Sequence, residues 1–198
     1  PDGSRRGRPD TTATNRVVTA GDRVYYRTEG GTLHAVGPDG ETAWARSVPE
    51  RDLLVGDGRI YAGGDRVVAV TTAGEVAWRD DDPGDGLVRD PDGDTLYARA
   101  GRRADRATAY DVRGAERWTF APPATDAWPE AATTDASVVT AITGKSADEP
   151  FYTVYAVDAY GRATAALDRD TVFDVLGRDG AVYLADGESR LLSLDSGG

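Results

Sequence analysis

The sequence of 198 residues has no cysteine, a single lysine, Lys145, and a single histidine, His34. The absence of cysteine excludes disulfide bonds, thiolate metal sites and thiol nucleophiles. No run of about 18 apolar residues occurs, so direct insertion of a helix into a membrane is not expected. No apolar stripe of helical period is present either, which removes helices from the predicted fold. The chain begins at Pro1, so we expect any export signal or lipid anchor to lie outside it.

The charged residues are biased in both sign and type. Of the 34 acidic residues 26 are Asp, 22 of the 23 basic residues are Arg, and the net charge is −11. Phosphate binding needs clustered cations, so neither nucleic acid nor an anionic lipid surface is an expected partner. An Asp-rich, almost Lys-free surface is typical of halophile proteins, because salt screens the repulsion between carboxylates. A GC-rich genome also favours Arg, Asp, Ala and Gly, but it does not require the acidic excess.

A repeated pattern predicts the fold. Segments 33–44 (LHAVGPDGETAW), 67–78 (VVAVTTAGEVAW) and 107–118 (ATAYDVRGAERW) each have a small residue, then Gly five positions later and Trp nine positions later. Segments 154–165 (VYAVDAYGRATA) and 191–198 (LLSLDSGG) continue the pattern without the Trp. The small residues are 34, 40, 47 and 37 positions apart, which is the period of a propeller blade and too irregular for a solenoid.

Within each period the apolar residues alternate with polar ones, and four strands fit. In the first period we expect strands at 16–20, 23–27, 32–36 and 42–48. The sequence therefore predicts an all-β protein, a β-propeller of about five four-stranded antiparallel blades, with blades at 16–50, 51–83, 84–123, 124–170 and 171–198.

The first 15 residues form an N-terminal segment outside these blades. Residues 1–3 match the turn at 38–40 that precedes a fourth strand. We therefore expect residues 4–9 to supply the outermost strand of the fifth blade and to close the ring. The alternative is that the chain is a fragment of a seven- or eight-bladed propeller.

The repeat, written Y…A-x-D-x-x-G-x-x-x-W, resembles that of the pyrroloquinoline-quinone-dehydrogenase-like propellers, a family whose repeat is shared by the lipoprotein scaffold of the outer-membrane β-barrel assembly machinery. The resemblance covers about residues 16–198, and the Asp of the motif is kept in Asp111, Asp158 and Asp195. In this family the repeat Trp docks between neighbouring blades. The resemblance therefore implies a structural role for Trp44, Trp78 and Trp118, in agreement with the large area that a recurrent indole buries.

The resemblance also bears on catalysis. Enzymes of the family use eight blades, a vicinal disulfide near the quinone and a calcium site of Glu, Asn and Asp. The five repeats, the lack of cysteine and the lack of such a cluster imply the non-enzymatic branch, with no cofactor, whose members act as interaction platforms.

The residues offer three further kinds of candidate site. His34 occupies a strand position that is apolar or uncharged in the other repeats, so we interpret it as a packed side chain. Asp90, Asp92 and Asp94 match the first ligand positions of a calcium loop, but Thr95 stands where that loop needs Gly, and a turn already explains the segment. Carboxylate pairs for glycoside hydrolysis could be drawn from the many aspartates, yet most of these lie in turns.

The irregular insertions predict where a partner binds. Segments 80–86, 101–106, 121–131 and 144–151 depart from the repeat, and the topology of a blade places all four on one face. Arginine and aromatic residues, typical interface anchors, occur in or next to them: Arg102, Arg103, Arg106, Trp128, Phe151 and Tyr152. Tolerated loop variation is the alternative interpretation of these insertions.

The sequence thus predicts a non-catalytic binding or scaffolding module that uses this face on a protein or glycan partner within a larger assembly. The alternative is an enzyme, either a divergent quinone-type dehydrogenase or a five-bladed glycosidase. We expect a secreted or surface-tethered protein; the alternative is the cytoplasm of a salt-accumulating halophile.

The composition generates a prediction about salt. Raising KCl from about 0.1 M to about 2 M shortens the Debye length to a few ångströms, so the repulsion between the carboxylates is screened. We expect the melting temperature to rise by tens of degrees over this range in calorimetry or circular dichroism. A melting temperature that does not change with salt would contradict the halophile interpretation.

Overall fold

The fold is known from a computed structural model that describes residues 13–91, 93–100, 106–122, 127–132, 139–143, 152–178, 181–188 and 190–195. Within these ranges the chain forms 19 β-strands and no helix. The strands build five antiparallel sheets, and each sheet uses consecutive strands in chain order. The predicted all-β propeller architecture is confirmed.

The strand bounds are as follows. The first sheet holds β1 (Ala13–Ala20), β2 (Arg23–Thr28), β3 (Thr32–Val36) and β4 (Thr42–Ser47). The second holds β5 (Asp52–Gly56), β6 (Arg59–Gly63), β7 (Val67–Thr71) and β8 (Val76–Asp80). The third holds β9 (Gly84–Arg89), β10 (Thr95–Ala100), β11 (Arg106–Asp111) and β12 (Glu116–Phe120). The fourth holds β13 (Ala127–Ala132), β14 (Val139–Thr143), β15 (Tyr152–Val157) and β16 (Ala163–Arg169). The fifth holds β17 (Val172–Arg178), β18 (Ala181–Asp186) and β19 (Leu191–Asp195).

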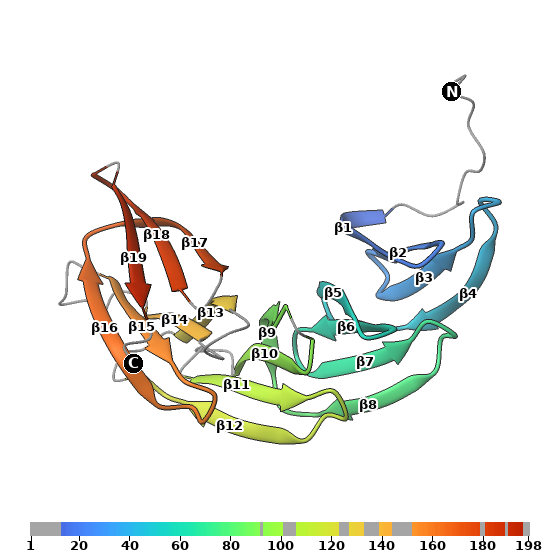
Figure 1. Ribbon diagram of the computed structural model, residues 1–198. Helices are drawn as coiled ribbons and strands as arrows, with labels where there is room; N and C mark the ends of the chain where they lie inside the picture. Colours follow the sequence, from blue (N-terminus) through green and yellow to red (C-terminus); the bar gives the residue numbers. More distant parts are fainter. Residues whose placement is uncertain are drawn as a thin grey trace.

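The five sheets follow one another along an open arc, with the first and fifth sheets at its two ends (Figure 1). The first strand of each sheet contacts the first strand of the next, so β1, β5, β9, β13 and β17 lie innermost. The strand that was expected to close the ring, at residues 4–9, lies outside the described residues.

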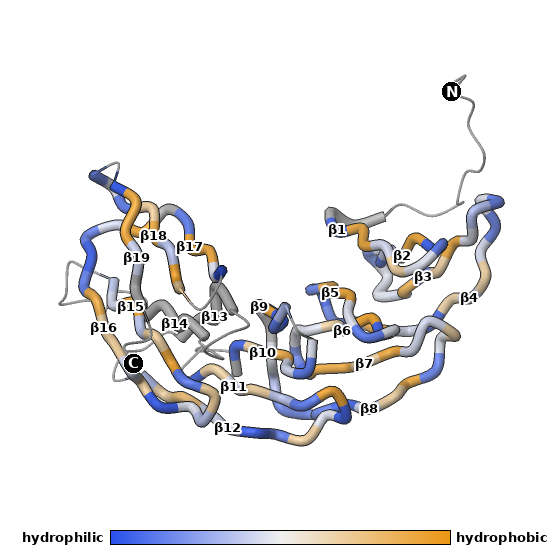
Figure 2. Tube along the Cα trace, viewed as in Figure 1, coloured by the Kyte–Doolittle hydropathy of each residue, from blue (hydrophilic) through white to orange (hydrophobic). Residues whose placement is uncertain are grey.

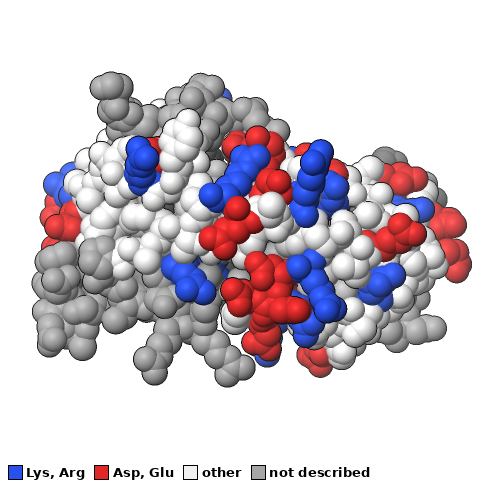
Figure 3. All heavy atoms as spheres, turned by 90° about the horizontal axis from the view of Figure 1, so that it is seen from below, with Lys and Arg blue, Asp and Glu red and all other residues white. Residues whose placement is uncertain are grey.

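Burial is highest in the middle strands of a sheet and lowest in its outer strand. Four of the five residues of β7 are buried, whereas most residues of β4 and β8 are exposed. Figure 2 shows the same contrast, with hydrophobic residues along β7 and hydrophilic residues at the turns. Figure 3 views the molecule from below and shows basic and acidic side chains side by side on its surface. A strand buried on both faces is apolar at successive positions, and one at the rim alternates.

Each inner strand points alternate side chains to the preceding and to the following sheet. We call these two sides of a sheet its incoming face and its outgoing face. In the second sheet Leu53 and Ile60 belong to the incoming face and pack in one core cluster with Tyr25 of the first sheet. Tyr61 and Val67 belong to the outgoing face and pack with residues of the third sheet. The core is therefore a series of clusters between successive sheets.

On the outgoing face, a Tyr of the second strand lies next to the Trp of the fourth strand. The ring centroids of Tyr25 and Trp44 are 5.8 Å apart, and those of Tyr61 and Trp78 are 6.0 Å apart. A third pair, Tyr97 and Trp118, has its centroids 5.7 Å apart. The tilted geometry of each pair is the one that aromatic rings favour.

Each of these tryptophans reaches the following sheet. The indole N–H of Trp44 donates to the carbonyl oxygen of Thr72 at 2.9 Å, and that of Trp78 donates to the carbonyl oxygen of Val112 at 3.1 Å. Both acceptors lie in the turn between the third and fourth strands of the next sheet. The indole therefore fastens an exposed outer strand to its neighbour.

The repeat glycine lies in this same turn, under the indole. A Cβ atom on Gly74 would lie 2.8 Å from Cδ2 of Trp44, and one on Gly114 would lie 2.5 Å from Cδ2 of Trp78. For Gly161 the closest atoms belong to Trp118, at 3.0 Å. All three glycines have a positive φ of 79° to 90°. Glycine is required twice here, for the turn and for the contact with the indole.

Mutations can separate the cost of the positive φ from the cost of the contact with the indole. Gly21→Ala meets a positive φ of 61° with no atom within 4 Å, so it should cost only the backbone term of about 1–2 kcal/mol. Gly114→Ala should cost more, because its Cβ also meets Trp78. In a Trp78→Ala background, itself destabilised by about 3–5 kcal/mol, the excess cost of Gly114→Ala over Gly21→Ala should disappear. Urea denaturation of six proteins, namely the wild type, the three single variants and the two double variants, measures this. An undiminished excess would contradict the packing of Trp78 on Gly114.

Candidate binding face

The connections between second and third strands share one face of the arc with those between successive sheets. We call this side the loop face, and the side that holds the remaining turns the turn face. Of the residues predicted to bind, Arg106 begins β11 and is exposed, and Tyr152 begins β15 and is half-buried. Arg102, Arg103 and Phe151 lie outside the described residues.

Two predicted insertions are shorter than expected. Residues 127–131 belong to β13, so the prediction that Trp128 lies in a loop is wrong. The loop prediction failed because Pro129 lacks an N–H group for a strand ladder, and the pairing of β13 with β14 indeed shifts between Pro129 and Ala131. Gly84 begins β9, so the second connection spans only residues 81–83. A Cβ on Gly84 would lie 2.5 Å from Val67, which explains a glycine within this strand.

A chain of charges crosses the loop face over the first three sheets. Nε of Arg66 lies 2.8 Å from Oε1 of Glu50, a residue whose side chain is 1 % exposed. Arg66 also approaches Asp81 at 3.8 Å, and Asp81 lies 3.5 Å from Arg79. Glu50 precedes β5, Arg66 precedes β7 and Asp81 precedes β9. A buried carboxylate is tolerated only when it is paired, so this network holds three separate connections together.

A polar pocket of about 340 Å³ opens between the second and third sheets. Its lining comes from the connection after β8 and from β11 and β12: Asp82, Arg106, Thr108, Tyr110, Glu116 and Thr119. The hydroxyl of Thr119 donates to Oε1 of Glu116 at 2.7 Å. Burial raises the pKa of Tyr110, and the nearby carboxylate of Asp80 raises it further, so this phenol stays protonated. The pocket offers both hydrogen-bond donors and acceptors, and its charged side chains are the acidic Asp82 and Glu116 and the basic Arg106.

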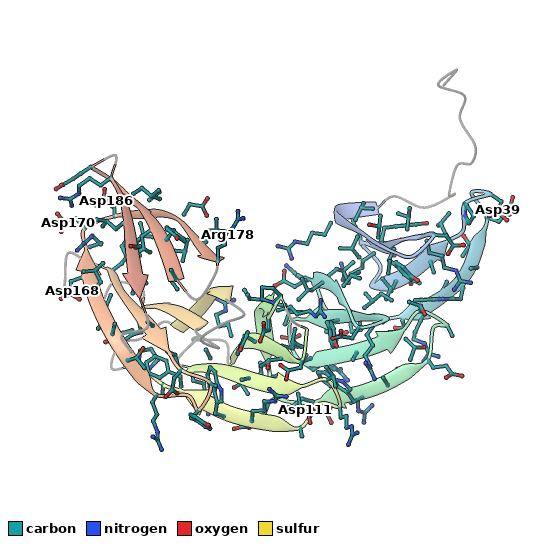
Figure 4. All side chains as sticks on the ribbon, viewed as in Figure 1. Asp39, Asp111, Asp168, Asp170, Arg178 and Asp186 are labelled. Carbon is teal, nitrogen blue, oxygen red and sulfur yellow. The ribbon has the colours of Figure 1, made fainter. Side chains whose placement is uncertain are left out.

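A second polar pocket, of about 350 Å³, lies between the fourth and fifth sheets. It is lined by the end of β16, the connection to β17 and the turn between β18 and β19: Asp168, Arg169, Asp170, Thr171, Asp186, Gly187, Glu188 and Arg190. Figure 4 shows the labelled Asp168, Asp170 and Asp186 gathered at this end of the arc. The pocket therefore lies on the loop face, at another junction between sheets.

Asp186 organises the second pocket. Its carboxylate accepts hydrogen bonds from the backbone N–H groups of Glu188 and Arg190 at 3.0 and 3.1 Å. The guanidinium of Arg190 donates two more, at 2.9 and 2.8 Å. These bonds, that of the Arg190 side chain above all, hold the pKa of Asp186 below its usual value. The turn is thus fixed by an ionised carboxylate that is 3 % exposed.

Comparison with known families supports the architecture. A family model described as "Outer membrane protein assembly factor BamB" matches residues 1–173. The chain belongs to this family. This family assignment agrees with the resemblance to pyrroloquinoline-quinone-type propellers that the repeats indicate.

A solved structure related to this BamB-family chain shows the same fold. It is the crystal structure of BamB from Moraxella catarrhalis, with 15% sequence identity and a TM-score of 0.50. The match covers 90% of this chain and 68% of that chain. No curated protein matches the sequence. The structure holds no candidate transmembrane helix in its described ranges.

The predicted calcium positions have structural partners in this BamB-family chain. Asp94 pairs with Arg117 at 3.3 Å and accepts a hydrogen bond from the hydroxyl of Thr95 at 2.8 Å. These two contacts, Thr95 first, lower the pKa of Asp94. Asp90 is buried in the turn between β9 and β10, and Asp92 lies outside the described residues. In the part of the chain that the structure describes, no group of three or more His, Cys, Asp or Glu could hold a metal ion.

His34, Asp111 and Asp158 are used in packing and turns. The ring of His34 stacks on Tyr26, with centroids 5.0 Å apart and planes 7° from parallel. Asp111 accepts hydrogen bonds from the backbone N–H groups of Ala115 and Arg113, which lower its pKa. Asp158, the next Asp of the repeat motif, accepts the equivalent two bonds. The motif's Asp therefore caps the docking turn. The general acid of a glycoside hydrolase needs a raised carboxyl pKa, whereas the pKa of Asp111 is lowered.

The contacts of Asp186 generate a prediction about pH. Because its pKa is lower in the folded chain than the ordinary Asp value of 3.8, the ionised carboxylate adds stability above that value. This stability is lost as the pH falls through the folded pKa. Asp186→Asn should therefore lower the melting temperature near pH 7, and the difference from the wild type should shrink between about pH 5 and pH 2. Asp170→Asn, at an exposed position of the same pocket, is the control. A loss from Asp186→Asn that is equal at both ends of the range would contradict the assigned role.

Proposed function

We propose that this chain is a non-catalytic binding and scaffolding module that holds a protein partner on its loop face, outside the cytoplasm. The observation that carries the proposal is the position of the two polar pockets. The pocket around Asp186 opens on the loop face between the fourth and fifth sheets, and the pocket between the second and third sheets has Asp82 and Arg106 at its loop-face end. Clefts with a few convergent polar groups are where proteins place binding sites.

The contrast between the two faces supports this choice. The turn face holds short hairpin turns that are committed to packing, since the turns containing Gly74, Gly114 and Gly161 receive the indoles of the preceding sheets. On the loop face, the Glu50–Arg66 pair joins the connection that precedes β5 to the connection that precedes β7. Preorganised loops on a rigid scaffold lower the entropy cost of binding.

The family supports a protein as the partner and a location outside the cytoplasm. The matching model is described as an outer membrane protein assembly factor, which names a function in bringing proteins together. A glycan partner is the alternative, and polar pockets of mixed charge also suit sugars. The lowered pKa values of Asp94, Asp111 and Asp186 support the non-catalytic part of the proposal.

Site-specific photocrosslinking tests the proposal. A photoreactive residue at Arg106 or Asp170 samples the rims of the two pockets, and both positions are exposed. The matched controls are Asp22 and Tyr160, which are exposed in turns of the turn face. In the native host, illumination should join the loop-face positions to one defined protein and leave both controls without that product. Equal crosslinking from the two faces would contradict the assignment of the face, and loop-face products with carbohydrate alone would favour the glycan partner.

A further inference from the structure

The polar pocket between the second and third sheets departs from the pattern of the repeat. Its Thr108 precedes the small residue of the third repeat, and the residues at that position in the second, fourth and fifth repeats are Val68, Tyr155 and Leu192. Val68 lies in a core cluster, and Leu192 packs against another. Tyr155 packs on the ring of Phe120, with centroids 5.4 Å apart. At this position the other junctions are therefore packed by apolar or aromatic side chains.

Two further positions of the lining are acidic where other repeats are apolar. Glu116 lies two residues after the repeat glycine, where the second and fourth repeats have Val76 and Ala163. Asp82 lies four residues after the repeat Trp, and the first repeat has at that position Val48, which is buried in a core cluster. The pocket of about 340 Å³ thus combines a break in the apolar packing with carboxylates placed around it.

The hydroxyl protons of the pocket are directed toward its carboxylates. The hydroxyl of Thr119 donates to Oε1 of Glu116 at 2.7 Å. The hydroxyl oxygens of Thr108 and Thr119 are 3.4 Å apart, and a hydroxyl carries one proton, so Thr108 is the donor of this pair. Thr108 is 3% exposed, and in the described part of the chain its hydroxyl oxygen accepts no hydrogen bond. A ligand that donates hydrogen bonds would satisfy this buried oxygen.

Tyr110 responds to the same arrangement of charge. It is 2% exposed, and burial first and then the carboxylates of Asp80, Glu116 and Asp82 raise its pKa. The phenol is therefore protonated and is the donor in its hydrogen bond to Asp80. Among the described residues these three carboxylates form no ion pair within 4.0 Å. The one basic residue of the lining, Arg106, is exposed at the loop-face end, so the interior of the pocket is negative and offers acceptors.

We propose that this pocket receives the cationic side chain of a lysine or arginine residue of the protein partner. An ammonium or guanidinium group donates several hydrogen bonds and carries the charge that the carboxylates lack within the chain. A neutral sugar also donates hydrogen bonds, but it would leave the carboxylates desolvated without a counter-charge. The inference rests on the proposed function and specifies which chemical group of the partner is bound.

Peptide binding to the isolated chain, followed by NMR, tests the inference. The probe is the pentapeptide Gly-Gly-Lys-Gly-Gly, acetylated and amidated, and its matched control carries norleucine in place of the lysine. We use the lowest KCl concentration at which circular dichroism shows a folded chain. The lysine peptide should shift the amide signals of β11 and β12 and should bind about tenfold or more tightly than the norleucine peptide. Raising KCl to about 2 M should weaken its binding, because salt screens the attraction.

Three variants locate the binding. Glu116→Gln should weaken binding of the lysine peptide by about tenfold, because one charged acceptor is lost. Arg106→Gln should strengthen it, because a like charge is removed from the entrance of the pocket. Glu75→Gln is the control for net charge, since Glu75 is exposed in the turn between β7 and β8, and it should leave the affinity unchanged. Opposite effects of the first two variants cannot arise from a general loss of structure.

The outcomes distinguish this inference from the proposed function. Equal binding of the lysine and norleucine peptides would overturn the inference, as would an affinity that Glu116→Gln leaves unchanged or that Glu75→Gln lowers equally. Binding of maltose without binding of the lysine peptide would assign the pocket to a glycan. If the lysine peptide fails while Arg106 and Asp170 still crosslink to one protein, only the inference about the pocket is lost. If the peptide binds and no protein is crosslinked, the protein partner is lost and the preference of the pocket for cations stands.

Discussion

The arc depends on one contact, the indole of an outer-strand Trp on the turn of the following sheet. Outer strands such as β4 and β8 are mostly exposed and contribute little to the core on their own. The indole changes this, because it packs on the Tyr of its own sheet and donates a hydrogen bond to a carbonyl of the next. One side chain thus joins an aromatic pair, a polar contact and a close fit against glycine. Each of the first three sheets is thus fixed to the next at its rim as well as at its inner strand.

This contact explains why the two faces of the arc differ. The indoles of Trp44 and Trp78 bind to the turns around Thr72 and Val112, which lie on the turn face. A longer or bulkier turn there would displace the indole, so that face keeps short turns with a positive-φ glycine. The loop face carries no such docking role, and its connections can lengthen. Variation and binding surfaces are therefore expected on the side that does not hold the sheets together.

The repeat could be predicted from the sequence because its members recur at fixed local spacing. The small residue, Gly and Trp are five and nine positions apart, and each has one role at every copy. The Tyr–Trp pairs are visible in the same register once the strands are placed. The limits of β13 and β9 could not be predicted, since Pro129 and Gly84 have loop-like local chemistry and become strand residues only through their neighbours in space.

The candidate site was predictable as a face but not as a set of residues. Arg106 was found because a cation near an insertion is conspicuous in an acidic chain. Glu50 and Arg66 were missed, since a buried carboxylate looks like any other in sequence and its partner lies 16 positions away. The pockets were missed for the same reason: each combines residues that are far apart in the sequence. Asp186 carried a local signal, an Asp followed four positions later by Arg, that a search for turn-capping carboxylates would detect.

The chemistry of the polar pockets limits what can bind there. In the pocket between the fourth and fifth sheets, Asp186 is ionised and already accepts two hydrogen bonds from the guanidinium of Arg190. A partner must therefore supply hydrogen bonds that replace water without leaving these charges buried and unpaired.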